Sequence, residues 1–184
     1  MFIVLMGLLC LIGCRSKKEK ELTSEKKESH FHIVQTDDEV KVFYEGGTTA
    51  IVTQNAKSDF RPYIHPILAP GSEVELTQFS PGHHKHQTGL FWGFTRINGL
   101  GAEQEEMKEW FYNPDKPEEI KKKIGRDFYH YPDGDHWQRV SVEVLKSEGD
   151  EVKWQTVYNM LDESRVPILK ETQTWTFTEK DGKY

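Results

Sequence analysis

Cysteine is scarce in this chain of 184 residues: there are only two, Cys10 and Cys14, both near the N-terminus. Everything after them lacks a pair that could form a disulfide, so its stability must come from packing. Basic residues do not outnumber acidic ones, and the formal net charge is −6. Because phosphate binding needs an excess of cationic side chains, nucleic acid is not expected as a partner. Beyond residue 13 no apolar run is long enough for a membrane-spanning helix.

The first residues, MFIVLMGLLCLIGC, form an apolar run that is too short to span a bilayer as a helix. It is typical of a signal peptide over residues 1–13. Its end, Leu11-Ile12-Gly13-Cys14, resembles the bacterial lipoprotein cleavage box, which predicts lipidation of Cys14. No Lys or Arg precedes the run, so a different start codon or a buried N-terminal helix stays open. We expect an exported, membrane-anchored lipoprotein on the periplasmic or cell-surface side, in contact with the membrane through its N-terminal lipid only.

Residues 14–29 are predicted to be a flexible tether. The stretch RSKKEKELTSEKKES mixes basic and acidic side chains without apolar periodicity, which is typical of a solvated segment. Residues 30–184 then have the length of one domain.

Short segments of period two begin at Phe31 and predict antiparallel strands. EVKVFYEGG ends in a glycine turn, and TTAIVTQN can return beside it. Pro62 and Pro66 flank the next segment, so it cannot be a central, fully paired strand. Residues 88–98 are almost continuously apolar and aromatic, which predicts a strand buried on both faces.

Residues 101–125 interrupt the strand pattern. AEQEEMKEWF has high helix propensity, and KPEEIKKKIG has a proline near its start, acids in its first turn, lysines in its last and a glycine at its end. We predict two short helices inserted between strands.

The C-terminal third alternates again, in HWQRVSVEVL, EVKWQTVYNM and VPILKETQTWTFT, and predicts a meander of three strands. The last of these strands would keep unpaired hydrogen-bonding groups along one edge. We therefore expect an incomplete sheet at the C-terminus and an N-terminal part of a longer protein.

Four stretches resemble the PmoA-like family, bacterial proteins catalogued as "methane oxygenase PmoA" domains: RPYIHPI (61–67), FSPGHHKHQTGLFWGFTRING (79–99), RDFYH (126–130) and ETQTW (171–175). The resemblance covers about residues 31–184. It implies an all-β, antiparallel β-sandwich of the mutarotase-like supersandwich type, in exported proteins often associated with carbohydrate metabolism. The family label also implies oxygen chemistry.

The family's central pattern is similar to His-Pro-His-His-Arg-Gly-Leu-Trp, and this chain departs from it. It maps onto residues 84–91, where His84 and His86 are kept, Gln87 replaces the third histidine and Thr88 replaces the arginine. Gln87 can still bind a hydroxyl, but it cannot titrate.

Three residue types that a carbohydrate site needs are present. Trp92 or Phe91 could stack on a sugar ring, and Arg61, Gln87 and Asn98 could bind its hydroxyls. His65, His84 and His86 titrate in the range that proton transfer requires and are the candidate catalytic residues. By analogy with aldose mutarotases we expect an epimerase or another sugar-processing enzyme, with Asp127 or Glu171 as candidate carboxylate partners.

Other interpretations stay open. On an extended segment His84 and His86 would point to one side and could share a divalent metal with His65, His130 or His136, as a metal-dependent oxygenase requires. A non-catalytic glycan-binding lipoprotein is the third. The tryptophans at 92, 137, 154 and 175 each have strand spacing, which by itself favours a core position. No cofactor is identified by the sequence.

Overall fold

The computed structural model describes residues 30–113, 115, 117–130 and 136–184. The signal peptide, the lipidation of Cys14 and the tether lie outside the described residues and stay predictions. Within the described residues, none of the helices has the length and apolar character needed to cross a membrane.

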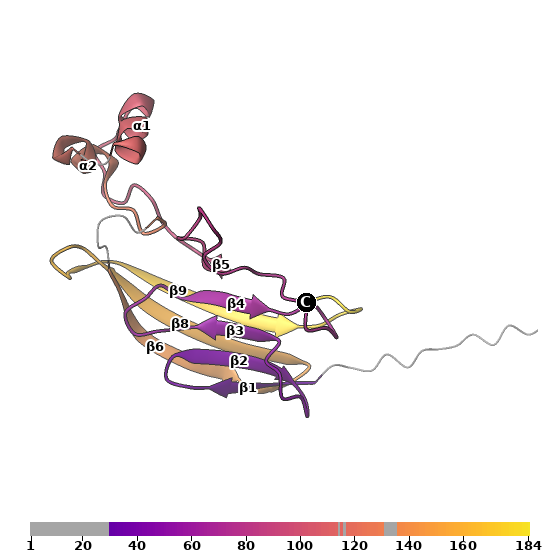
Figure 1. Cartoon of the computed structure of the whole chain (residues 1–184). Coiled ribbons are helices and arrows are strands. Elements are labelled where there is room, and N and C mark those ends of the chain that lie inside the picture. Colours follow the sequence, from indigo (N-terminus) through magenta and orange to yellow (C-terminus); the bar gives the residue numbers. More distant parts are fainter. Residues whose placement is uncertain (1–29, 114, 116, 131–135) are drawn as a thin grey trace, which may run out of the picture.

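The first sheet contains six strands in the order β5-β4-β3-β2-β1-β7 (Figure 1). Each neighbouring pair is antiparallel. β4 pairs with β3 on one side and with only a two-residue strand on the other, as the flanking prolines predict. The strands are β1 (Phe31–Gln35), β2 (Glu39–Tyr44), β3 (Val52–Asn55), β4 (Tyr63–Ile67), β5 (Leu90–Phe91) and β7 (Glu148–Gly149).

The second sheet is the predicted C-terminal meander, with the order β6-β8-β9. Its long strands lie behind the first sheet in Figure 1. β7 lies in the turn between β6 and β8 and pairs with β1, which joins the two sheets at one end. β9 pairs only with β8 among the described strands, so its other edge is open, as expected. The strands are β6 (His136–Lys146), β8 (Glu151–Leu161) and β9 (Pro167–Thr178).

The main core fills the space between the two sheets and makes the fold an all-β sandwich, as predicted. Alternate residues of each strand point inward, because successive side chains in a strand lie on opposite faces. The buried members come from both sheets: Phe31, Val40, Val42, Ile51, Val52, Ile64, Val152, Trp154 and Phe177. A smaller cluster of Phe128, Trp137, Tyr158 and Met160 lies under the segment that carries the candidate site.

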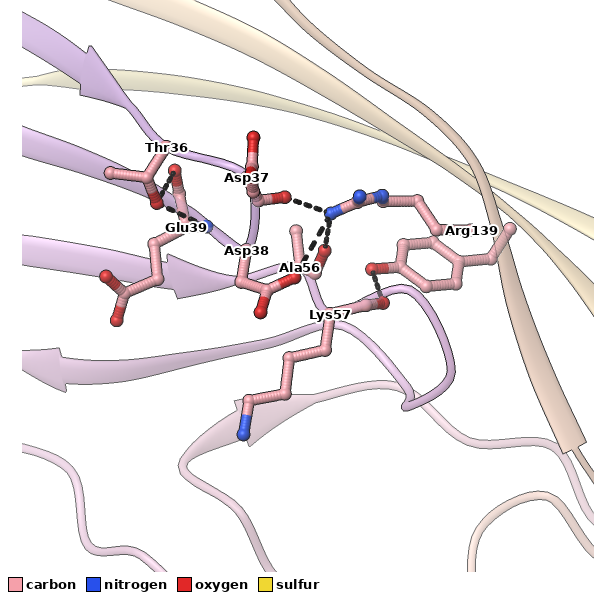
Figure 2. Close-up of polar contacts among 8 residues, drawn as sticks. Thr36, Asp37, Asp38, Glu39, Ala56, Lys57 and Arg139 are labelled. Carbon is pink, nitrogen blue, oxygen red and sulfur yellow. Dashed lines mark hydrogen bonds and ion pairs between the residues drawn. The ribbon is translucent and has the colours of Figure 1, made fainter.

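Arg139 of β6 ties the second sheet to loops of the first (Figure 2). Its guanidinium donates to the carbonyl oxygens of Asp37 and Ala56 and lies 3.7 Å from a carboxylate oxygen of Asp38. Its backbone N–H donates to the carbonyl of Ser58 at 2.9 Å. These contacts hold the ends of β1 and β3 against β6.

Two helices interrupt the strands where the sequence predicts them, α1 (Gln104–Tyr112) and α2 (Glu118–Ile124). A capping box joins Glu103 and Glu106 at the start of α1, Pro117 precedes α2, and Gly125 follows it. Figure 1 shows both helices projecting away from the sheets.

The segment of residues 88–98 differs from its prediction. Only Leu90 and Phe91 form a strand, and Trp92 and Phe94 are exposed rather than buried on both faces. Apolar composition alone does not distinguish a buried strand from an aromatic surface segment. The core prediction for Trp92 is therefore wrong, whereas Trp137 and Trp154 are buried.

Candidate functional site

His84 and His86 lie in two consecutive turns, not on the extended segment that the sequence predicts. The backbone N–H of His84 donates to the carbonyl of Pro81 at 2.8 Å, and that of Gln87 donates to the carbonyl of His84 at 2.9 Å. Proline and glycine ahead of the histidines favour such turns over a strand. The two imidazole rings nevertheless lie near each other, with centroids 5.7 Å apart and nearly perpendicular planes. His84 is exposed, and His86 is half-buried.

The turns bring His86 against residues that are more than forty positions away in the sequence. Its ring centroid lies 5.0 Å from that of His130 and 5.6 Å from that of Tyr129. Both partners belong to the stretch RDFYH, which follows α2. His84, His86, Tyr129 and His130 thus form one cluster of rings, called here the histidine cluster.

A buried carboxylate orients His130 in this cluster. Asp127 Oδ2 lies 2.7 Å from His130 Nδ1, and the Asp127 side chain is only 4% exposed. Its Oδ1 accepts the backbone N–H groups of Tyr129 and His130, each at 2.9 Å. Because an ionised carboxylate only accepts hydrogen bonds, Nδ1 of His130 is the donor and Nε2 is the basic nitrogen of the neutral ring. His130 is 34% exposed, so the oriented ring reaches the surface.

His86 differs electrostatically from its neighbour. Burial lowers the pKa of His86 from its usual value, and the nearby His130, His84 and Arg61 lower it further, with Asp127 opposing part of the shift. His86 therefore favours the neutral form, while the neighbouring His130 is in contact with the Asp127 carboxylate. Two adjacent imidazoles in different surroundings can divide the roles of base and acid.

Arg61 is buried beneath the histidine cluster and contacts Tyr129 and Phe91. Its side chain is buried, Nη1 donates to the carbonyl of Tyr129 at 2.7 Å, and its guanidinium carbon lies 3.8 Å from the centroid of the Phe91 ring. Phe91 in turn packs on Tyr129, with centroids 5.2 Å apart. Arg61 was expected to bind a hydroxyl; its described contacts instead fix the two aromatic rings beside the histidines.

Gly93 allows Tyr129 to come this close. A Cβ at residue 93 would lie 2.6 Å from the Cα of Tyr129, a distance that side chains do not tolerate. The glycine after the aromatic pair is thus a packing requirement of the site.

A hollow of about 450 Å³ meets the cluster at Tyr129, and Gln87 and Phe91 also contribute to its wall. A stacking ring and an amide at one hollow are the groups expected for binding a polyhydroxylated ligand. The roles expected for Gln87 and Phe91 stay predictions.

The other expected site residues lie elsewhere. His65 Nδ1 is 2.9 Å from Thr77 Oγ1, and its ring packs against Phe79 at 5.8 Å, outside the histidine cluster. Asn98 lines a hollow of about 650 Å³ beside α2, together with Arg126 and Glu163. Trp92 lines a further hollow against β9, as does Glu171. His136 begins β6. The described residues contain no group of three or more His, Cys, Asp or Glu side chains arranged to hold a metal ion.

The pairing of Asp127 with His130 was not predicted from the sequence, although both residues were candidates separately. The available signal is their spacing, since an aspartate in a turn can accept the N–H groups two and three residues later. The contact of this turn with His86 has no local signal, because it depends on how distant segments pack.

Comparison with known proteins identifies one family. Residues 34–184 match a family described as "Family of unknown function (DUF6807)". No curated protein and no solved structure matches the chain significantly. The resemblance to PmoA-like proteins is not tested by this match and stays a prediction. Since the match covers most of the chain, the protein belongs to the DUF6807 family of unknown function.

Proposed function

We propose that the protein acts on a carbohydrate by proton transfer, using His86 and His130 as a base and acid pair. The observation that carries this proposal is the contact between His130 Nδ1 and the buried Asp127 carboxylate at 2.7 Å, next to a second imidazole. A histidine oriented by a buried carboxylate is a recurrent arrangement for general acid–base catalysis.

The chemistry that fits is opening and closing of a sugar ring. Neutral His86 takes the proton of the anomeric hydroxyl while protonated His130 gives a proton to the ring oxygen. The bond between the anomeric carbon and the ring oxygen breaks, and an open-chain carbonyl forms. Rotation about the bond between C1 and C2, followed by the reverse proton transfers, closes the ring as the other anomer. Protons are exchanged but no electrons are, so the step needs no oxidant or reductant.

The ligand class follows from the wall of the adjacent hollow. Phe91 and Tyr129 present aromatic rings, and Gln87 presents an amide that can both donate and accept hydrogen bonds. Aromatic faces suit the C–H face of a sugar ring, and amides suit hydroxyl groups. The resemblance to proteins associated with carbohydrate metabolism points to the same class.

The test is an exchange measurement between anomers. D-Glucose, D-galactose, D-mannose and D-glucuronate are each mixed with the protein, and the interconversion of α and β anomers is followed by magnetisation exchange NMR. We expect acceleration for at least one sugar, a loss of about 100-fold in the His130→Gln variant and a comparable loss in His86→Gln. The matched control is His32→Gln. His32 lies on β1 and stacks on Phe43 of β2, and β2, β3 and β4 separate β1 from β5 in the sheet.

Two outcomes would contradict the proposal. If acceleration survives in both cluster variants, these histidines do not transfer the proton. If no sugar is accelerated but one binds in saturation-transfer NMR, the protein is a glycan-binding module rather than an enzyme.

A further inference from the structure

A second hollow lies at the open edge of the sandwich, separate from the histidine cluster. It has a volume of about 520 Å³ and lies between β9 and the segment that follows β5. Trp92 and Phe94 line one side, and Glu171, Gln173 and Trp175 line the other. Phe91 and Trp92 are consecutive in the chain: the first packs on Tyr129 of the histidine cluster, and the second lines this hollow.

The strand side of the hollow carries buried polar atoms whose hydrogen bonding is incomplete. Gln173 is 8% exposed, and its Oε1 accepts from Trp175 Nε1 at 3.1 Å and from Gln54 Nε2 at 3.3 Å. Its Nε2 makes no hydrogen bond of normal geometry within the described residues, and neither does the buried Oε2 of Glu171, although the two side chains lie close enough for Gln173 to lower the pKa of Glu171 by hydrogen bonding. Leaving a buried polar group unpaired destabilises the fold, so such atoms beside a hollow point to a ligand that would pair with them.

The two polar groups are complementary in kind. Gln173 Nε2 is a donor, and Glu171 Oε2 is an acceptor when ionised. Burial raises the pKa of Glu171, while the neighbouring Gln173 side chain opposes part of this shift. A ligand that both donates and accepts at adjacent positions, as two vicinal hydroxyl groups do, would satisfy both atoms.

Aromatic rings line both sides of the hollow. Trp175 is held in place, because it stacks on Trp154 with 20° between the ring planes and donates to Gln173. Trp92 is 56% exposed, although a large aromatic side chain is normally mostly buried. A fixed aromatic wall, an exposed indole and polar atoms lacking partners together fit an amphipathic ring rather than an apolar chain.

The charges of the residues that line the hollow do not favour an anionic ligand. Lys170 and Glu171 both line the hollow and have opposite signs, so no net positive field selects phosphate or carboxylate groups. A neutral polyhydroxylated ring remains the chemistry that the hollow suits.

We infer that this hollow is a glycan-binding subsite in which a pyranose unit stacks on Trp92 and its vicinal hydroxyls bind Gln173 and Glu171. The ligand class rests on the proposed function, and the subsite extends it from a single sugar to a chain of sugars. A saccharide held here would be bound independently of the proton-transfer residues.

The experiment measures binding of four neutral pentasaccharides, cellopentaose, maltopentaose, xylopentaose and mannopentaose, by isothermal titration calorimetry. At least one is expected to bind, and Trp92→Ala should weaken it about 30-fold, as loss of an aromatic hot spot does. Glu171→Gln should weaken it about tenfold. Tyr112→Ala is the matched control, because Tyr112 is an 85% exposed aromatic residue on α1.

The outcomes separate this subsite from the catalytic proposal. Pentasaccharide binding that is unchanged in both Trp92→Ala and Glu171→Gln, or absent with all four probes, overturns the subsite. Retained binding in His130→Gln is expected, because that residue lies in the histidine cluster. If Trp92→Ala weakens binding while no anomer exchange is accelerated, the subsite stands and the catalytic function falls. Melting temperatures of the variants check that each one is folded.

Discussion

Replacement of Asp127 tests most directly whether a buried carboxylate organises the site. It accepts two backbone N–H groups at 2.9 Å and His130 Nδ1 at 2.7 Å, and the residue is 3% exposed. Hydrogen bonds to a charged group contribute about 1.5–3 kcal/mol each. Asp127→Ala removes all three and leaves their donors without this acceptor, so we expect a loss of about 4 kcal/mol in the free energy of unfolding.

Asp127→Asn separates the charge from the shape. The amide oxygen can still accept the backbone N–H groups of Tyr129 and His130, while the charged bond to the imidazole is lost. We expect a loss of about 1–2 kcal/mol, or about 3–6 °C in Tm for a domain of this size. Urea unfolding followed by tryptophan fluorescence measures both variants. Asp150→Asn is the control, since its side chain is 60% exposed.

The imidazole itself gives the second readout. Nitrogen NMR of the wild-type protein should show His130 with its proton on Nδ1, and Asp127→Asn should shift this tautomer equilibrium toward Nε2–H. If Asp127→Ala unfolds within about 1 kcal/mol of wild type, or if neutral His130 already carries its proton on Nε2, the carboxylate does not orient the ring.

Three further predictions concern the surroundings of the site and the joint between the sheets. The pKa of His86 in the folded protein lies below the unfolded value of 6.5, so acidification favours the unfolded state. The wild type should therefore lose stability relative to His86→Gln as pH falls below 6.5. Urea midpoints of the two proteins that stay parallel from pH 8 to 5 would contradict this. Arg139→Met removes the donors to two loop carbonyls and should cost about 1–3 kcal/mol in urea unfolding; a cost below about 0.5 kcal/mol would mean that the sheets do not depend on this contact. Gly89→Ala should cost at least about 3 kcal/mol, because φ is +78° and the new Cβ would lie 2.3 Å from the carbonyl oxygen of Ile64. Gly71→Ala, at φ +63° in open space, should cost only about 1 kcal/mol, and equal losses at the two glycines would refute the steric argument.

The strands and helices were largely predictable because their signals are local. Alternation in residues 136–146, 151–161 and 167–178 reproduces the meander almost residue by residue. The helices follow from propensity and end signals. The segment 88–98 was not predictable in the same way, because an apolar composition has no period that separates a buried strand from a surface segment.

The candidate site was predictable in composition but not in arrangement. His86, Gln87 and Phe91 were expected near a ligand; the structure places Gln87 and Phe91 in the wall of one hollow and His86 against His130. Arg61 was expected there too, but its burial under Phe91 depends on how β4 and β5 pair. His65 and Asn98 matched the same chemistry and lie in other places.

Local sequence determined the all-β class, the helical insertion and the turn chemistry around Asp127, because each depends on residues a few positions apart. Tertiary packing alone decided that His86 meets His130, and that Trp92 faces Glu171 and Gln173 across a hollow. Those contacts join segments separated by more than forty residues. No periodicity or spacing within either segment specifies them, since they arise only when distant segments pack together.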